Sequence, residues 1–384
     1  MTKLPSLCRT RRIANARRGR PTAASRYLVC LVGAVAFLVC AVTDARAEIN
    51  LATGNLYERF ADYAPRGAER LSFIRHYNSR AAPTYGPTAP LGALWRSDYE
   101  RYLIFHPRAP VVKAERPDGK GLYFGIKNGV GVPDSDIDLT LVKIGENWVL
   151  TDQDGTEERY GAPDRTGRSQ PLSIKAPDGY ARTLTYNAAN QLVSVSDTEG
   201  RTLTLAYDGD NLITVTTPDG LVLTYGYDSS GPAFHNDRLV SVSYSTDPEK
   251  NRTYVYENAS FPHALTGIVD GKGNRLLTWT FDDLGRATSS ERAGGVNLTI
   301  VSYDRDERGN PVNTVTNSRG ERTVYKFAIL QNMAKIAEID RPATATTPAF
   351  TQRFTYDERG YLIKQSDSRG NVTNYWPKTQ TQSP

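Results

Sequence analysis

The fold of this chain is decided by the stretch from Gly179 to Asp228, which reads GYARTLTYNAANQLVSVSDTEGRTLTLAYDGDNLITVTTPDGLVLTYGYD. Gly179, Gly200 and Gly220 are each followed, seven residues on, by a tyrosine. A leucine stands eight residues before both Gly200 and Gly220. A fixed period of about 20 residues is the mark of a repeat architecture. We therefore interpret the stretch as tandem copies of one structural unit.

Apolar and polar residues alternate within each copy. Leu203, Leu205 and Tyr207 alternate with Thr202 and Thr204. A period of two predicts a half-buried β-strand, because successive side chains leave a strand on opposite faces. Tight-turn sequences rich in Pro, Asp and Gly separate these strands. Each copy is thus predicted to be a hairpin, and because a lone hairpin is marginal in water, the copies should pair into one antiparallel sheet.

The same pattern continues, with insertions, toward the end of the chain. The predicted repeat signature comprises Tyr186, Gly200, Tyr207, Asp208, Gly220, Tyr227, Asp228, Tyr303, Asp304, Gly320, Tyr356, Asp357, Gly360 and Gly370. We expect one continuous antiparallel sheet over residues 115–376, with longer loops at 229–237 and 341–350. The segment from Val324 to Ile339 is the nearest to a helical pattern, but it is also compatible with a strand.

The first 47 residues have a different composition. Residues 1–26 carry eight Lys or Arg and no acidic residue, and residues 27–42 are uncharged and mostly apolar. Ala45-Arg46-Ala47 then precedes Glu48, as in a signal-peptide cleavage site. We predict a secretory signal peptide over residues 1–47, cleaved before Glu48, and a secreted, periplasmic or cell-surface protein. The alternative is an uncleaved membrane anchor, although sixteen residues are short for a span of ~20.

Removal of this segment changes the chemistry of the chain. Cys8, Cys30 and Cys40 are the only cysteines and all precede Glu48, so we expect no disulfide and no cysteine nucleophile in the mature protein. The remaining residues hold 38 basic and 41 acidic side chains, a net charge of −3. The basic character of the whole chain therefore belongs to the export signal and gives no reason to expect a nucleic-acid partner.

The residues resemble a known family at several places. The run Tyr356-Asp357-Glu358-Arg359-Gly360-Tyr361-Leu362, followed by Asp367-Ser368-Arg369-Gly370, resembles the RHS or YD repeat. Residues 48–110, with their Asn-Leu-Ala-Thr-Gly-Asn and Arg-His-Tyr-Asn-Ser runs and Trp95, resemble the leader that precedes such repeats in bacterial RHS proteins. The resemblance covers roughly residues 48–376. It implies long antiparallel sheets that form hollow shells, many of them enclosing a C-terminal toxin.

The domain prediction that follows is a signal peptide at 1–47, a β-rich leader at 48–110, RHS/YD repeats at 111–376 and a disordered tail at 377–384. The fold class is all-β, with tandem hairpins in one long curved antiparallel sheet and an open or partial shell. The family's Asp-Pro-x-Gly-Leu self-cleavage motif is absent, since Asp247-Pro248 is followed by Glu249-Lys250. Toxin delivery and self-cleavage therefore do not carry over from the resemblance.

Residues that could carry chemistry are few. His76, His106, His235 and His263 lack the spacing of a metal site or a paired base, and Asp134, Asp136 and Asp138 begin like a calcium loop that then fails at Leu139 and Gly145. We predict no catalytic residue, no cofactor and no metal. The four tryptophans and the many tyrosines could form a sugar-stacking face, but packing between neighbouring strands is the favoured interpretation. A carboxylate pair for a wall-acting hydrolase has no nominee among the acids.

Three functions stay open at this point. The first is a non-enzymatic surface scaffold that binds carbohydrate or a cell-surface protein. The second is a partial toxin shell that wraps a separately encoded effector, and the third is a cell-wall hydrolase. We also expect an open wrap with an accessible concave face, and self-association through an unpaired final strand near Asn371 to Tyr375. Membrane attachment would arise only through an uncleaved signal segment.

Overall fold

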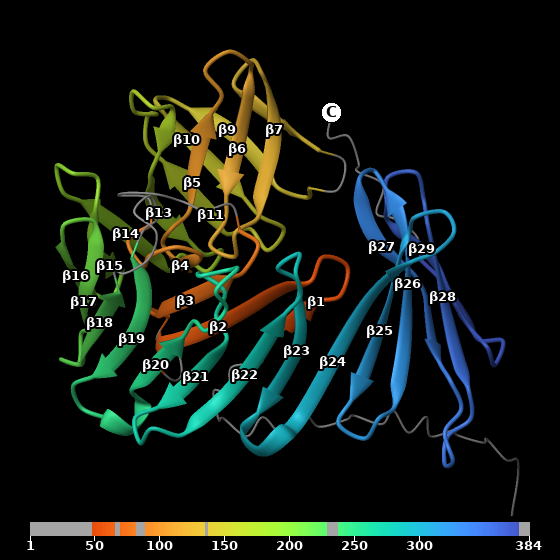
Figure 1. Ribbon diagram of the computed structural model, residues 1–384. Helices are drawn as coiled ribbons and strands as arrows, with labels where there is room; N and C mark the ends of the chain where they lie inside the picture. The colour runs from red at the N-terminus through yellow and green to blue at the C-terminus, as the bar shows by residue number, and fades with distance from the viewer. Residues whose placement is uncertain (1–47, 66–69, 82–88, 135–136, 229–236, 376–384) are drawn as a thin grey trace, which may run out of the picture. The chain divides into compact units, whose positions relative to one another are not determined.

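The computed structural model describes residues 48–65, 70–81, 89–134, 137–228 and 237–375 of the 384-residue chain, and these ranges are built from β-strands and turns (Figure 1). They contain no α-helix, and their 3-10 helices are η2 (Pro248–Lys250) and η3 (Ala293–Gly295). None of these helices is long and apolar enough to cross a membrane. The predicted signal peptide, with Ala45 and Ala47, and the predicted tail lie outside the described residues, whereas Glu48 begins the first strand.

The leader forms a small antiparallel sheet of its own. Its strands, in spatial order, are β1 (Glu48–Asn50), β2 (Asn55–Tyr63), β3 (Phe73–Asn78) and β4 (Trp95–Ser97). The predicted leader extends to residue 110, but the strand that follows Ser97 already belongs to the second sheet. The change of sheet therefore falls before Tyr102, earlier than the predicted domain boundary.

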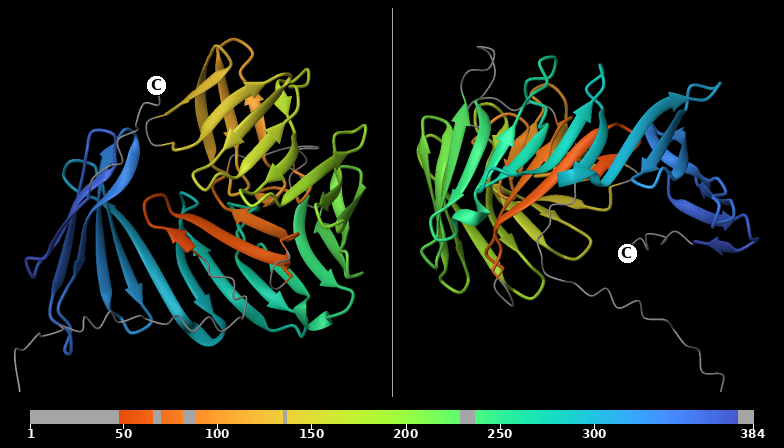
Figure 2. Two further views of the ribbon diagram at one scale, coloured as in Figure 1. Left: turned by 180° about the vertical axis from the view of Figure 1, so that it is seen from behind. Right: turned by 60° about the horizontal axis from the view of Figure 1, so that its bottom comes forward.

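The second sheet takes 26 strands in almost strict chain order, and Figure 2 shows their succession from two further sides. Its first part consists of β5 (Tyr102–Phe105), β6 (Val111–Glu115), β7 (Gly121–Lys127), β8 (Val130–Pro133), β9 (Thr140–Ile144), β10 (Asn147–Thr151), β11 (Glu157–Tyr160) and β12 (Arg168–Ser169). Its middle part consists of β13 (Pro171–Lys175), β14 (Ala181–Tyr186), β15 (Leu192–Asp197), β16 (Thr202–Asp208), β17 (Asn211–Thr216), β18 (Val222–Asp228), β19 (Arg238–Tyr244), β20 (Arg252–Val255), β21 (Gly267–Asp270), β22 (Arg275–Phe281) and β23 (Ala287–Arg292). Its last part consists of β24 (Val296–Arg305), β25 (Pro311–Asn317), β26 (Arg322–Leu330), β27 (Met333–Arg341), β28 (Phe350–Tyr356), β29 (Leu362–Asp367) and β30 (Val372–Asn374).

The sheet as a whole does not close into a barrel, because β30 pairs with β29 and with no other described strand. A local closure exists at the other end: β11 pairs with β13, and β12 pairs back onto β5. The strands from β5 to β12 thereby surround a core of their own. That core contains Leu103, Val112, Ala114, Phe124, Leu141, Trp148, Leu150 and Tyr160.

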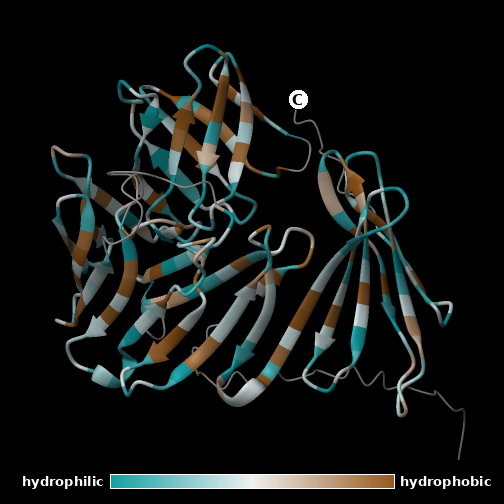
Figure 3. Ribbon diagram, viewed as in Figure 1, coloured by the Kyte–Doolittle hydropathy of each residue, from teal (hydrophilic) through white to brown (hydrophobic). Residues whose placement is uncertain are grey.

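The hairpin prediction and the continuous antiparallel sheet are confirmed. Consecutive strands from β13 to β30 pair antiparallel, most of them through short turns, with longer connections after β20 and β27. Colouring by hydropathy shows apolar positions alternating along these strands (Figure 3). The segment from Val324 to Ile339 forms parts of β26 and β27 rather than a helix. This segment forms strands because it pairs with neighbouring strands on both sides, and alternate side chains then lie on opposite faces of the sheet.

The largest core lies between the leader sheet and strands β13 to β23. Leu56, Phe73 and Trp95 of the leader pack in it with residues such as Leu203 and Leu223 of the repeats. Each of these side chains is fully buried. Burial of a side chain of this size contributes roughly 1.5–3 kcal/mol, so the leader supplies much of the apolar cover that the repeats need on this face.

Candidate functional site

The repeat tyrosines form a ladder of hydrogen bonds across the sheet. The Tyr207 hydroxyl donates to the backbone oxygen of Leu192 at 2.9 Å, and Leu192 is itself the residue that pairs with Tyr186. Tyr227 donates likewise to Leu212 at 2.7 Å, and Leu212 pairs with Tyr207. Each tyrosine therefore ties its own hairpin to the preceding one, which gives the period a physical cause.

The other signature tyrosines make the same kind of bond. Tyr186 donates to the backbone oxygen of Pro171 at 3.0 Å, Tyr303 to that of Ala287 at 2.5 Å, and Tyr356 to that of Ile336 at 2.8 Å. A β-bulge accompanies Tyr186, Tyr207, Tyr227 and Tyr356 in their pairings with the next strand. Such bulges re-aim a side chain, and here they accompany the bond to the neighbouring hairpin.

The signature glycines close the turns between strands. Gly200, Gly220, Gly320, Gly360 and Gly370 all have φ values between +79° and +85°, a region that glycine adopts without steric cost. In each turn the glycine N–H donates to the backbone oxygen three residues earlier. These glycines therefore have a structural role, which is to close the turns between strands.

The signature aspartates differ in role. Asp357 caps its turn, because its carboxylate accepts from the backbone N–H groups of Arg359 and Tyr361. Asp228 instead pairs with Arg238, and Asp304 accepts from the N–H of Arg305. Asp208 pairs across its turn with Asn211. The Tyr-Asp dipeptide thus recurs in the sequence, but its aspartates make different contacts from one repeat to the next.

Sequence reasoning missed a set of turn-capping side chains. An Asp or Asn three residues before a turn glycine accepts hydrogen bonds from the N–H groups two and four residues later, as Asp197 does from Glu199 and Arg201. The same pattern holds at Asp270, Asp282, Asp306, Asn317 and Asp367. The spacing of Asp or Asn to Gly was the available signal.

The leader and the repeats meet at a buried ion pair. Arg75 of β3 donates through Nη2 to the Asp62 carboxylate of β2 at 2.9 Å, and its Nε contacts the same carboxylate. Tyr225 of the repeats donates to Asp62 at 2.8 Å, and Arg75 reaches the Tyr254 hydroxyl at 2.5 Å. Burial opposes charge on Arg75, but Asp62 outweighs it and keeps the Arg75 pKa above its ordinary value. These residues hold the two sheets together rather than forming an open site.

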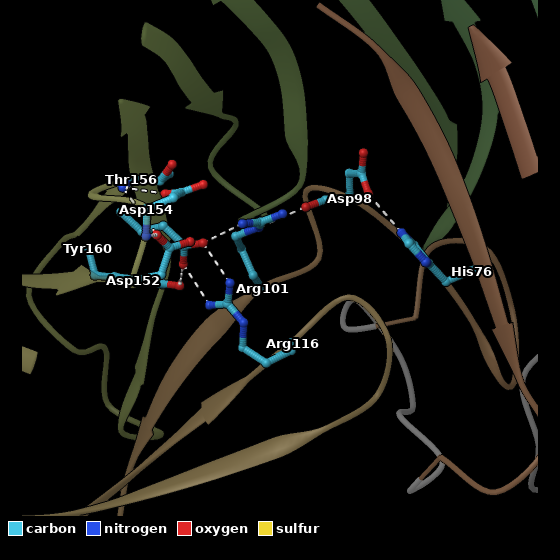
Figure 4. Close-up of polar contacts among 9 residues, drawn as sticks. His76, Asp98, Arg101, Arg116, Asp152, Asp154, Thr156 and Tyr160 are labelled. Atoms are coloured by element: carbon cyan, nitrogen blue, oxygen red, sulfur yellow. Dashed lines mark hydrogen bonds and ion pairs between the residues drawn. The ribbon is translucent and has the colours of Figure 1, made fainter. Parts of the chain in front are cut away.

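A second polar network lies beside the local closure (Figure 4). Glu158 of β11 accepts from Arg116 through two bonds of 2.7 Å, from Tyr160 at 2.5 Å, and pairs with Arg101. Burial alone would raise the pKa of Glu158, but Arg101 and Arg116 together lower it to about 2. The carboxylate is therefore ionised and fully engaged, so it is unsuited to act as a general acid or base.

His76 is the histidine with the most developed surroundings. Its ring nitrogens lie 2.6 Å from the Tyr57 hydroxyl and 2.7 Å from the Asp98 carboxylate, which Figure 4 shows for Asp98. The order Tyr, His, Asp resembles a catalytic relay, yet the His76 side chain is only 7 % exposed. We interpret the group as a structural joint between β2, β3 and the segment after β4. Its partners are distant in sequence, which is why the spacing of the histidines did not reveal it.

The tryptophans do not form a sugar-stacking face in the described part of the chain. Trp95, Trp148 and Trp279 are all buried, and Trp95 donates through Nε1 to the Tyr256 hydroxyl at 2.9 Å. Trp376 lies outside the described residues. Within the described ranges no group of three His, Cys, Asp or Glu side chains is placed to hold a metal ion; of the aspartates in the calcium-like run, Asp136 is not described.

An apolar face of the sheet continues past the core that the leader covers. Asn313 of β25 contacts the backbone oxygen of Leu51, so its side of the sheet is the one that faces the leader. Asn313 pairs with Tyr325, and Tyr325 pairs with Ile339, so these residues share that face. The core shared with the leader reaches Ala287 in β23 and includes no residue of β25 to β30. Tyr325 and Ile339 are accordingly only half-buried.

The opposite face of the same strands is polar. Lys326 of β26 pairs with Glu338 of β27 at 2.6 Å, and Arg353 of β28 pairs with the same carboxylate at 2.8 Å. We name the apolar side of β26 to β28 the leader-side face and define it by Tyr325, Phe327, Ile336, Ile339 and Phe354. Of these side chains only Phe327 is buried. The contrast between the two faces makes the leader-side face the strongest candidate surface for a partner.

Comparison with known protein families agrees with this geometry. A model described as a domain of unknown function (DUF6531) matches residues 46–124, and the RHS repeat model matches residues 164–202 and 186–217. The first model covers the leader sheet and the strands up to β7. The second covers the stretch that contains Tyr186 and Tyr207 of the tyrosine ladder. A comparison with curated protein sequences finds no match.

Three solved structures show limited likeness. A crystal structure of TcdB2-TccC3 has a TM-score of 0.26 and 12% identity, over 83% of this chain and 22% of that chain. A Tc holotoxin pore of Photorhabdus luminescens with a mutated TccC3 has a TM-score of 0.28 and 10% identity, over 83% of this chain and 25% of that chain. A porin-like protein from Bacteroides uniformis has a TM-score of 0.17 and 12% identity, over 61% of this chain and 91% of that chain. This chain thus spans about a quarter of the first two.

The ladder, the glycine turns and the family models lead to one class of protein. Tandem hairpins joined by tyrosine hydroxyls define an all-β repeat protein whose units depend on their neighbours. The matched models give that class its name: residues 164–217 carry RHS repeats, and residues 46–124 form a DUF6531 region.

Proposed function

We propose that this protein is a non-enzymatic scaffold of the RHS-repeat type that binds a separately encoded polypeptide on the leader-side face of β26 to β28. The observation that carries the proposal is the half-buried state of Tyr325, Ile339 and Phe354 where the leader-covered core ends. An apolar sheet face is stable in water only when something packs on it. In strands β13 to β23 the leader meets that need, so a partner would continue an interface that already exists.

The expected partner presents an apolar strand or helix face. Tyr325 and Phe327 alternate along β26 on the leader-side face, and Ile336 and Ile339 face them from β27. Aromatic and aliphatic side chains in one patch are typical of interface cores. The charged side chains of Lys326 and Arg353 lie on the other face, where each pairs with Glu338. Carbohydrate, the other expected ligand, has less support because Trp95, Trp148 and Trp279 are buried.

Photocross-linking tests the proposal in cells that produce the protein. A photoreactive amino acid replaces Phe354 in one variant and Thr355 in a matched control, since Thr355 is its neighbour in β28 and is exposed on the opposite face. The proposal expects a discrete adduct with a different polypeptide from position 354 and none from position 355. An adduct with a second copy of this chain would instead indicate self-association, and no adduct from either position would refute the proposal.

The edge strand gives the self-association outcome a physical basis. β30 exposes Val372, Thr373 and Asn374, and it carries neither a charge nor a proline to prevent pairing with another chain. Sedimentation of the purified protein separates the two cases. A monomer that still gives the adduct from position 354 supports the polypeptide partner. A dimer whose adduct is with itself refutes it.

The absence of catalysis and the export of the protein are parts of the same proposal. A cell-wall zymogram of the purified protein should show no clearing, because the buried carboxylates of Asp62 and Glu158 are paired with arginines. Recovery of the protein outside the cytoplasm with Glu48 as its first residue would support the secretory route. Retention of residues 1–47 would favour the anchored alternative.

A further inference from the structure

A cavity of about 550 Å³ lies at the end of strands β25 to β30. Two turns and one loop line it: the turn from Asn317 to Gly320, the turn from Asp367 to Gly370, and the loop between β27 and β28. Its volume is within the range of small-molecule sites. The cavity is separate from the middle of the leader-side face, and the two share no residue named for that face.

Four arginines line this cavity against one carboxylate. They are Arg319, Arg322, Arg341 and Arg369, and the acidic residue is Glu321. Glu321 pairs with Arg319 at 2.8 Å. Arg322, Arg341 and Arg369 have no ion pair with any described residue. A concave site that holds three guanidinium groups without an ion pair, one of them near the Asp367 carboxylate, attracts anions, because walls of low dielectric focus the field.

The arginines are placed by the repeat itself. The turns Asn317-Ser318-Arg319-Gly320 and Asp367-Ser368-Arg369-Gly370 have the same form, and in each the capping side chain accepts from the arginine N–H at 2.9–3.0 Å. The capped turn fixes the backbone of each arginine. Arg341 ends β27 opposite Phe350, and the guanidinium groups of Arg341 and Arg369 lie 5.7 and 5.5 Å from the Phe350 ring centre.

The charge at this turn position changes along the sheet. Turns two strands apart lie on the same edge of an antiparallel sheet, so the residues just before the turn glycines can be compared. The early turns have Asp178, Glu199 and Asp219 at this position, whereas the later turns have Lys272, Arg319 and Arg369. The backbone requires only the glycine and its cap, so basic residues are not needed for the turn. Of these three basic residues Arg319 and Arg369 line the cavity, and two basic turn residues at one cavity point to a ligand.

We propose that this cavity binds a small ligand that carries two oxyanion groups, either carboxylates or phosphates. Guanidinium groups match both oxyanions through paired N–H donors, and such charge-assisted bonds are among the strongest in proteins. Arg341 and Arg369 hold one oxyanion beside Phe350, and Arg322 with Arg319 holds the other. The polar side chains of Thr344 and Thr347 in the β27–β28 loop contact the frame between them. This proposal is independent of the polypeptide partner.

Isothermal titration of the purified protein tests it with three probes. Digalacturonate supplies two carboxylates, fructose 1,6-bisphosphate supplies two phosphates, and maltose is an uncharged disaccharide. Saturable binding of either dianion, weakened by added salt and absent for maltose, is the expected result. The stronger dianion identifies the oxyanion. Failure of both dianions to bind, or equal binding of maltose, overturns the proposal.

A matched pair of variants shows where binding occurs. Arg369→Ala should raise the dissociation constant of the dianion about tenfold, because one charge-assisted contact is lost. Arg359→Ala is the control, because Arg359 occupies the same position of the Asp357–Gly360 turn at the other edge of the sheet. Its effect should stay within about twofold, the scatter of a surface change. An equal loss in both variants would mean non-specific attraction and would overturn the site. Both arginines are exposed, so folding is preserved.

Discussion

Asp62 and Arg75 lie on neighbouring leader strands, and their ion pair is completed by tyrosines that are more than 160 residues away in the chain. Tyr225 and Tyr244 donate to Asp62 at 2.8 and 3.1 Å, and Arg75 also lies 5.0 Å from the ring centre of Trp95. The pair is fully buried. The buried ion pair of the leader therefore depends on hydrogen bonds from the repeats. We expect the leader and the repeats to fold cooperatively.

The buried pair yields the largest predicted loss of stability. Asp62→Ala leaves the Arg75 guanidinium buried without its carboxylate, and we expect the free energy of unfolding to fall by about 3–5 kcal/mol. Urea unfolding monitored by tryptophan fluorescence measures this change. Lys326→Ala serves as the control, because the exposed Lys326–Glu338 pair should contribute at most about 1 kcal/mol. Comparable losses in the two variants would contradict the role assigned to Asp62.

The tyrosine ladder predicts a smaller and more local effect. Tyr207→Phe removes the hydroxyl that donates to the backbone oxygen of Leu192, so that oxygen loses its cross-hairpin donor. The expected decrease in the free energy of unfolding is about 1–2 kcal/mol. Tyr123→Phe is a matched change at a tyrosine that is 48% exposed, and it should stay within about 0.5 kcal/mol. A ladder with no energetic role would make both variants indistinguishable from the parent.

Turn glycines should resist substitution because of their backbone conformation. Gly220 has a φ of +84° and nothing within 4 Å of an added Cβ, so Gly220→Ala tests backbone strain without a steric clash. We expect a loss of about 1–2 kcal/mol. Gly125 lies in β7 outside the left-handed region, and an added Cβ there meets only the Val132 oxygen at 3.9 Å. Gly125→Ala should therefore be neutral or slightly stabilising, and thermal unfolding of the two variants compares them.

Glu58 gives the protein a predicted pH dependence. Burial raises the pKa of Glu58 from 4.5 to about 8, although Arg292 opposes the shift. The folded state keeps this proton between pH 4.5 and 8 while the unfolded chain releases it, so the free energy of unfolding should decrease as the pH rises through that window. Glu58→Gln cannot titrate and should be the more stable protein at pH near 9, by roughly 5 kcal/mol, the free-energy equivalent of a pKa raised from 4.5 to about 8.

In Glu58→Gln the free energy of unfolding should still depend on pH, because a second carboxylate is buried. Burial raises the pKa of Glu100 to about 7, partly offset by its contact with the Ser97 N–H. It therefore acts in the same direction below pH 7. Chemical unfolding at several pH values should show a reduced slope in Glu58→Gln, with the remainder confined to the lower part of the range. Identical profiles for the parent and the variant would show that Glu58 is ionised in the folded protein.

Much of the local structure follows from residue type and spacing alone. Alternation in Leu203, Leu205 and Tyr207 predicts a strand because a sheet has two faces, and Gly200 and Gly220 predict turns because they tolerate positive φ. The roughly 20-residue spacing predicts hairpins that need neighbours. These features depend on contacts within a few dozen residues, so they could be predicted before any tertiary contact was known.

The contacts that distinguish this molecule could not be predicted in that way. Nothing in the spacing of Asp62, Arg75 and Tyr225 brings them together, and the same is true of Arg319, Arg341 and Arg369 around the cavity. Even for the signature tyrosines, the sequence did not predict which backbone oxygen each hydroxyl would contact. Such partners are selected by which hairpin lies next to which and by where the leader packs.

The sequence by itself therefore determined an all-β chain of tandem hairpins with glycine turns, because strand alternation and turn conformation are local properties of the backbone. Only the tertiary structure decided that the core shared with the leader extends to β23, that the leader-side face of β26 to β28 remains half-buried, and that Arg341 of β27 and Arg369 of a turn converge beside Phe350. The physical reason is that burial and charge depend on distances between segments far apart in the chain. Those distances are fixed by packing rather than by any local preference.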